Sequence, residues 1–148
     1  REIFSKHTYA HRLNGIFSDM GIEKRIAIDP NIMILAKANS QVEMDMLIQF
    51  THTQSYRNFY LVIESEYGKA FVTDKLPENI ALLALGEVKA WAYKNQNKYT
   101  IAGWLTPSNY YGEYYLRDLV NASIYEPEAK GWAKALGKDV LVMVRLRY

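Results

Sequence analysis

The chain has 148 residues, of which 49% are hydrophobic and 23% are charged, a composition typical of a compact globular domain and not of a disordered chain. Its formal net charge of +2 is too small to indicate nucleic-acid binding by itself, and the absence of cysteine excludes disulfides and thiolate metal sites. No apolar run reaches about 18 residues, so we expect no membrane span, and the lack of cysteine fits the reducing cytoplasm.

The first predicted element is a helix over Ser5–Met20. Ser5 can cap its start and Gly21 can end it, and apolar residues recur between them at i, i+3, i+4 and i+7. This spacing predicts one buried face, formed by Leu13, Ile16, Phe17 and Met20. The opposite face carries His7 and His11.

Two predicted strands follow, over Ile26–Lys37 and Val42–Phe50, joined by the polar turn "ANSQ". Residues i and i+2 of a strand point to the same face. The second strand would therefore carry Glu43 and Asp45 on one face, with Met44 and Met46 on the core face.

The segment Thr51–Gly68 fits two structures. Its "FYLVIES" run has strong strand propensity, whereas its tyrosines, Phe59 and Ile63 also recur at helical spacing. The sequence leaves open whether residues 53–67 form a helix or a strand.

The second half of the chain predicts a hairpin of Ile80–Trp91 with Tyr99–Leu105 across "KNQN". A helix from about Asn109, a short helix from Pro127 to Gly137 and a closing strand over Val140–Tyr148 come next. This order predicts a single domain over residues 1–148 with a mixed α/β (α+β) architecture, in which a central sheet is flanked by helices.

The carboxylates of the first hairpin suggest a metal site. Mg²⁺ in proteins takes one or two carboxylates plus waters, and Glu43 and Asp45 supply two, with Asp29 or Asn31 as a third ligand from the preceding strand. The alternative is a half-exposed strand whose polar face meets water.

The stretch "DPNIMILAKANSQVEMDMLIQF" resembles the hairpin of the PD-(D/E)XK, or restriction-endonuclease-like, nuclease superfamily. In this resemblance Pro30 and Asn31 match "PD", Glu43 matches the acidic position and Asp45 falls where the family has Lys. The resemblance implies a domain that cuts DNA phosphodiesters with Mg²⁺-activated water, with Glu43 and Asp45 as catalytic residues and Asp29, Asn31, Glu43 and Asp45 as metal ligands. Because Asn31 is neutral and Asp45 is not a cation, the site would be atypical, would take its Lys from elsewhere in the chain, or would be catalytically dead.

A second alignment of the motif places the acidic strand at "VIESEYGK". Glu64 and Glu66 would then be the acidic pair, with Lys69 nearby and Asp45 as the first acid. The connection that follows is short and contains Pro77, so a crossover helix has little room there, and the first alignment is preferred.

Two further clusters are candidates for binding. His7 and His11 lie at i and i+4 and could hold a metal or contact a phosphate, or they could be exposed helix histidines. "YYGEYY" packs four tyrosines into six residues, which suits base stacking or a subunit interface. Under the nuclease interpretation the nucleic-acid contacts are His7, His11, Tyr110, Tyr111 and Tyr114.

Two functions therefore follow from the sequence. The first is the Mg²⁺-dependent endonuclease-like domain acting on DNA, which we expect to be a homo-oligomer because one site cuts one strand. The second is a non-catalytic binding or structural module that uses the tyrosine-rich surface.

Overall fold

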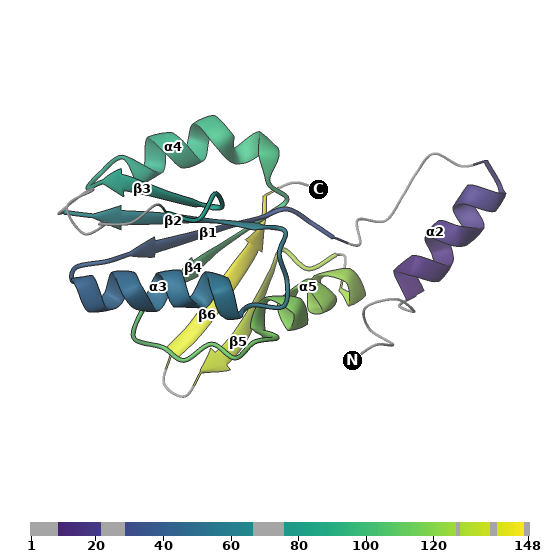
Figure 1. The fold of residues 1–148 in the computed structure, drawn as a ribbon. Coiled ribbons are helices and arrows are strands. Elements are labelled where there is room, and N and C mark those ends of the chain that lie inside the picture. Colours follow the sequence, from purple (N-terminus) through teal and green to yellow (C-terminus); the bar gives the residue numbers. More distant parts are fainter. Residues whose placement is uncertain (1–8, 22–28, 67–75, 127, 137–138, 147–148) are drawn as a thin grey trace.

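The protein is built around one six-stranded sheet (Figure 1). Its strands are β1 (Ile32–Lys37), β2 (Phe59–Ser65), β3 (Ile80–Ala84), β4 (Ile101–Leu105), β5 (Gly131–Leu136) and β6 (Asp139–Arg145). Their spatial order is β3-β2-β1-β4-β6-β5, in which β1 to β4 are parallel and β6 is antiparallel to both of its neighbours. This computed structural model describes residues 9–21, 29–66, 76–126, 128–136 and 139–146.

Helices cover both faces of the sheet. They are α3 (Gln41–Thr53), α4 (Val88–Asn95) and α5 (Tyr115–Tyr125), with a short 3₁₀ turn η2 (Gln96–Lys98) after α4. A further helix, α2 (Tyr9–Asp19), lies apart from the sheet (Figure 1). Buried residues of α3 and α5 share one apolar cluster on one face, and residues of α4 share the cluster on the other face. This arrangement confirms the predicted fold class, a mixed sheet flanked by helices. None of the helices in the described part of the chain has the length and hydropathy needed to cross a bilayer.

The centre of the sheet is apolar on both sides. The β1 sequence "IMILAK" is a nearly continuous apolar run, as expected for a parallel strand covered on both faces. Ile32 and Ile34 belong to the cluster with α3 and α5, whereas Met33 belongs to the cluster with α4. On the α4 side, the rings of Tyr60 and Trp91 stack at 5.7 Å.

The predicted strand Val42–Phe50 is wrong, because these residues lie in the helix α3. Ser40 caps the helix by accepting a hydrogen bond from the backbone nitrogen of Glu43 at 3.2 Å, and the Glu43 carboxylate accepts one from the backbone nitrogen of Asn39 at 2.6 Å. The pattern S-x-x-E is a helix-start signal, present here as "SQVE", with the Glu43 carboxylate accepting from the residue before the cap. Met44 is buried as expected, but Met46 is exposed, since helical and not strand spacing decides which side chains face the core.

The ambiguity at residues 53–67 is resolved over the described residues 53–66, where the last residue of α3 is followed by a loop and then by strand β2. The predicted hairpin of Ile80–Trp91 with Tyr99–Leu105 is wrong. The strand β3 ends at Ala84, α4 begins at Val88, and β2 and β1 lie between β3 and β4 in the sheet. Gly86 adopts a φ of +87° in the turn before α4, a conformation that favours glycine.

The predicted short helix from Pro127 to Gly137 is also wrong. Residues Gly131–Leu136 form β5, which pairs with β6 from Gly131 opposite Val144 to Leu136 opposite Asp139. Pairing with a neighbouring strand overrides the helix propensity of this Ala- and Lys-containing segment. The closing strand over Val140–Tyr148 is confirmed as β6 over Asp139–Arg145.

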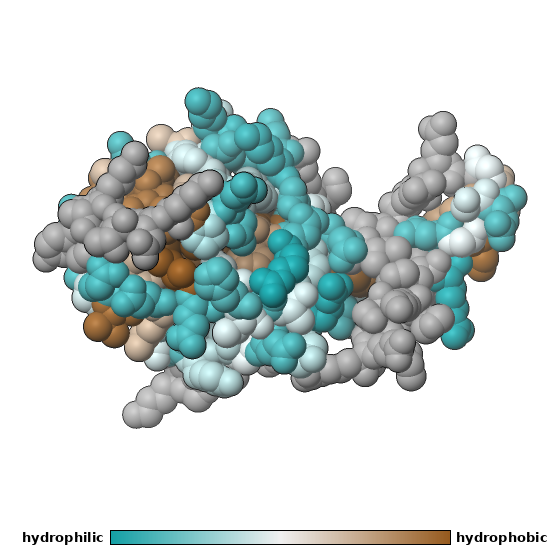
Figure 2. Space-filling model, viewed as in Figure 1, coloured by the Kyte–Doolittle hydropathy of each residue, from teal (hydrophilic) through white to brown (hydrophobic). Residues whose placement is uncertain are grey.

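The first predicted helix is confirmed as α2, but the predicted burial of its apolar face is not. Figure 1 shows α2 standing apart from the sheet, and Figure 2 shows apolar surface on it. Ile16 is 51% exposed and Met20 is 67% exposed, whereas Phe17 is half-buried. The side chain of Leu13 lies outside the described residues. The prediction failed because no other described element packs over Ile16 and Met20.

Candidate functional site

A groove of about 410 Å³ lies between α3 and the loop that joins β4 to α5. In the view of Figure 1 this loop runs beside α3 before it enters α5. The α3 wall of the groove consists of Met46, Leu47, Gln49, Phe50 and Thr53. The opposite wall comes from the end of β4 and from residues 107–111 and 113. A groove of this volume is within the range that takes a small ligand or a few side chains of a peptide.

Aromatic rings fix the floor of the groove. Phe50 of α3 packs edge-to-face against Tyr111 of the loop, with ring centroids 5.5 Å apart, and Tyr111 packs in the same way against Tyr115 at 5.0 Å. The Tyr111 hydroxyl accepts a hydrogen bond from the backbone nitrogen of Thr106 at 3.0 Å and donates one to the Thr106 carbonyl at 3.2 Å. Tyr111 therefore closes the loop on itself and also supports the floor.

A buried glutamine joins the loop to the end of α3. Gln54 is fully buried, and its side-chain nitrogen donates to the Gly112 carbonyl at 3.0 Å. Its side-chain oxygen accepts from the backbone nitrogen of Leu116 at 3.1 Å, in the first turn of α5. The backbone nitrogen of Ser55 donates to the Glu113 carbonyl at 2.8 Å. These three bonds hold the loop and the start of α5 in a fixed position relative to α3.

The rim of the groove is polar and carries one carboxylate, that of Glu113. Tyr110 is 87% exposed and stands at the rim with Ser108 and Glu113, which are also exposed. The sequence of α3 and of residues 106–114 contains the carboxylates of Glu43, Asp45 and Glu113 and no Lys or Arg. This charge pattern favours a cationic ligand and disfavours a phosphate backbone.

The structure does not bring the predicted metal ligands together. Asp29 and Asn31 precede β1, whereas Glu43 and Asp45 follow it, and a strand of six residues spans about 20 Å. On a helix, residues i and i+2 also point about 200° apart, so Glu43 and Asp45 do not share a face. Within the described ranges, no group of three His, Asp or Glu side chains is placed to hold a metal ion.

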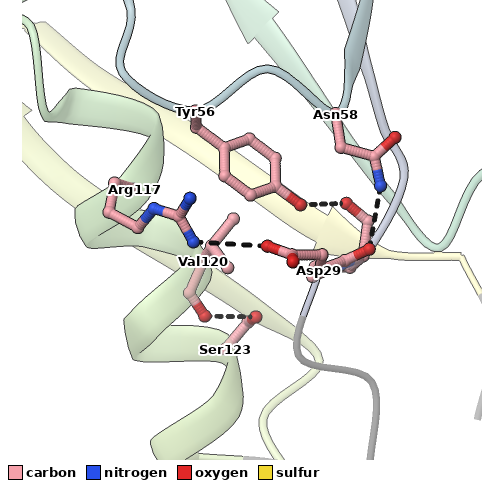
Figure 3. A network of polar contacts seen from close by, with 7 residues as sticks. Asp29, Tyr56, Asn58, Arg117, Val120 and Ser123 are labelled. Atoms are coloured by element: carbon pink, nitrogen blue, oxygen red, sulfur yellow. Dashed lines mark hydrogen bonds and ion pairs between the residues drawn. The ribbon is translucent and has the colours of Figure 1, made fainter. Parts of the chain in front are cut away.

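Asp29 belongs instead to a network at the amino ends of β1 and β2 (Figure 3). Its carboxylate lies 3.3 Å from Nη1 of Arg117, whose guanidinium lies 4.7 Å from the centre of the Tyr56 ring. Asn58 donates to the Asp29 carbonyl at 2.9 Å, and the Tyr56 hydroxyl donates to the Pro30 carbonyl. Burial, with a smaller contribution from Asp29, raises the pKa of Tyr56 well above its usual value. This network ties α5 to the start of β1.

The other predicted acidic and amide ligands also make structural contacts. Asn31 donates to the Lys98 carbonyl at 3.1 Å, and Asp45 accepts from the Gln41 side chain at 2.8 Å. In the second alignment of the motif, Glu64 accepts from the backbone nitrogen of Gly86 at 2.6 Å and so holds the turn before α4. Glu66 is exposed in the turn after β2, and Lys69 lies outside the described residues.

Of the five predicted nucleic-acid contacts, the three tyrosines have side chains within the described residues. His7 lies outside the described residues, and so does the side chain of His11, which belongs to α2. Tyr111 is buried in the groove floor and Tyr114 is half-buried, so Tyr110 is the member of this tyrosine set with an open ring. Sequence reasoning missed Phe50 and Gln54, and it passed over the "SQVE" signal that begins α3.

Comparison with known proteins assigns no family to the chain. A scan against protein-family models found no match, and a search of curated proteins found none either. The nuclease resemblance, the binding of Mg²⁺ and the action on DNA therefore stay predictions.

Proposed function

We propose that the protein is a binding module that holds an apolar, positively charged segment of a polypeptide in the groove between α3 and the β4–α5 loop. The observation that carries this proposal is the pairing of an apolar floor with a rim on which the Glu113 carboxylate is the one charged group of the described lining. Apolar contact supplies affinity for such a ligand, and complementary charge supplies orientation and selectivity.

The shape of the groove supports a helical ligand. Its α3 wall runs from Met46 to Thr53, seven residues along the helix axis, or about 10 Å. An amphipathic helix that lies in such a groove inserts side chains spaced at i and i+4, which is a common mode of peptide recognition. Tyr110 at the rim offers a large, flat contact surface of the type that contributes most at protein interfaces.

The side chains that line the groove support binding over catalysis. Its titratable groups are Glu113, Tyr110 and Tyr111, and the Tyr111 hydroxyl is engaged with Thr106. General acid–base or nucleophilic catalysis needs a reactive group beside a base that activates it. The described lining contains neither His nor Lys, so it offers no such pair.

Binding of two matched peptides to the whole chain tests the proposal. Both peptides are helical and carry Ile and Met at i and i+4, but one has Lys and Arg on its polar face and the other has Glu. We expect calorimetry to detect binding of the basic peptide, with an affinity that falls as salt is added, and little binding of the acidic peptide. Equal binding of the two peptides, or binding of neither by a chain whose groove is vacant, would contradict the proposal.

Two exposed tyrosines provide a matched pair of variants. Tyr110→Ala removes a ring at the groove, whereas Tyr93→Ala removes a ring of similar exposure on α4, across the sheet. We expect Tyr110→Ala to weaken binding of the basic peptide about tenfold, or ~1.4 kcal/mol, and Tyr93→Ala to leave it unchanged. Glu113→Gln should weaken the salt dependence of binding. If Tyr93→Ala has the larger effect, the ligand binds elsewhere.

A further inference from the structure

One side of α2 carries three exposed residues in a row. Arg12, Ile16 and Met20 follow each other at i, i+4 and i+8, and all three are exposed. Met20 continues the last turn of the helix, because its backbone nitrogen donates to the Ile16 carbonyl at 3.0 Å. At a rise of 1.5 Å per residue the row is about 12 Å long. We call Arg12, Ile16 and Met20 the α2 stripe.

The α2 stripe has the chemistry and length that the groove requires. Its two apolar residues suit the Met46 and Phe50 part of the groove, and its cation suits the carboxylate of Glu113 at the rim. The length of about 12 Å is close to the length of about 10 Å over which α3 lines the groove.

Resting on the proposed function, we propose that the ligand of the groove is the α2 helix of a second copy of this chain. In the resulting dimer each copy donates its α2 stripe to the groove of the other. Such a contact is closed, because a twofold axis satisfies both grooves and both helices at once. It would make the chain the homo-oligomer that the sequence analysis predicted, by a route independent of nuclease activity.

Two features of the structure allow a second copy to be the source of the helix. Figure 1 shows α2 standing away from its own sheet, so both the stripe and the groove of one chain lack a covering element among the described residues. Residues 20–31 lie between α2 and β1 in the sequence, and a chain of that length reaches at most about 40 Å. This reach is sufficient to place α2 on a neighbouring molecule.

The oligomeric state of the whole chain gives the first test. Light scattering coupled to gel filtration should give the wild type twice the chain mass of 17.2 kDa. Ile16→Asp, which puts a charge into the stripe, should give the mass of a single chain. Ser18→Asp is the matched control, since it adds the same charge about 200° around the helix, and it should remain a dimer. A monomeric wild type, or a dimer that survives Ile16→Asp, overturns the proposal.

Disulfide cross-linking gives the second test. Because the chain contains no cysteine, only the introduced cysteines can form a disulfide. Met20→Cys protein is mixed with protein that carries either Thr53→Cys or Ser108→Cys, one at each part of the groove. We expect oxidation of one of these two mixtures to give a disulfide-linked dimer of the two unlike variants. The yield of this dimer should be well above the yield of dimer from either variant alone. A doubly substituted chain that closes within itself as a monomer would show that α2 binds its own groove. Absence of any cross-link would remove α2 from the groove altogether.

The Ile16→Asp variant separates failure of this inference from failure of the proposed function. If α2 occupies the groove in the dimer, this variant should bind the basic peptide more tightly than the wild type does, because its groove is vacant. If the variant and the wild type bind that peptide equally, the groove is a binding site but α2 is not its ligand. If neither binds the peptide, both proposals fail.

Discussion

Gln54, at the end of α3, caps the first turn of α5 through Leu116. The Gln54 side-chain oxygen lies 3.1 Å from the backbone nitrogen of Leu116, and the Gln54 side-chain nitrogen lies 3.0 Å from the carbonyl oxygen of Gly112. The residue that flanks α5, Tyr114, makes no side-chain cap of its own. One buried amide therefore holds both the loop at Gly112 and the start of α5.

Replacing this amide should destabilise the protein strongly. Gln54→Leu keeps a similar volume but leaves the N–H of Leu116 and the carbonyl of Gly112 without their partner, and we expect a loss of about 2–4 kcal/mol in the free energy of unfolding. Gln96→Leu, at an exposed position of η2 away from the groove, is the control and should change it by less than about 0.5 kcal/mol. Urea denaturation measures both. Equal losses would mean that the Gln54 bonds contribute little.

Glu43 distinguishes a helix cap from a metal ligand. As a cap, Glu43→Ala should lower the free energy of unfolding by about 1 kcal/mol, and Glu43→Gln should lower it less, because Gln also accepts the hydrogen bond from the Asn39 nitrogen. If Glu43 is a metal ligand instead, Glu43→Gln should destabilise the protein in Mg²⁺ as much as Glu43→Ala does. The wild type should then melt at a higher temperature with Mg²⁺. Melting curves of the three proteins with Mg²⁺ and with EDTA decide the matter. We expect no effect of the ion.

Arg117 should contribute more through the Tyr56 ring than through its ion pair. The Asp29 side chain is 62% exposed, and exposed ion pairs contribute little, so Asp29→Asn should change the free energy of unfolding by less than about 0.5 kcal/mol. Arg117→Leu loses the contact with the ring as well, and we expect a loss of about 1 kcal/mol. Chemical denaturation at low and high salt measures both variants. A larger loss for Asp29→Asn would show that the ion pair dominates.

Buried tyrosines should make the protein sensitive to alkaline pH. Burial raises the pKa values of Tyr56 and Tyr115, and also that of Tyr99, above the ordinary value of 10.0. Between the unfolded and folded pKa values the folded chain holds protons that the unfolded chain has lost. The free energy of unfolding should therefore stay level up to about pH 10 and fall above it.

Urea denaturation across this pH range, with phenolate absorbance recorded in parallel, tests the expectation. Tyr56→Phe should be less stable at neutral pH, because it lacks the bond to the Pro30 carbonyl, but it should lose less stability above pH ~10. A stability that rises with alkaline pH would contradict the assignment.

The amino-acid sequence determined the parts of the fold that local pattern encodes. The apolar runs of β1 and β6 and the helical spacing of α2 predict the existence of these elements, and with them a sheet flanked by helices. The α3 helix was misread because "EMDM" alternates over only four residues, too few to separate a period of 2 from one of 3.6. The capping signal of Ser40 and Glu43 was in the sequence and would have corrected the error.

Only the tertiary structure decided the strand order, the strand β5 and the groove. Strand β5 exists because β6 pairs with it, although its own residues favour a helix. Gln54 and Leu116 are 62 residues apart, and no sequence pattern near either residue indicates the hydrogen bond between them. Contacts at such separations depend on how the elements pack, and packing is set by the whole set of apolar faces at once. Local propensity therefore could not place Asp29 and Glu43 at opposite ends of β1, or bring Phe50 and Tyr111 together beneath the groove.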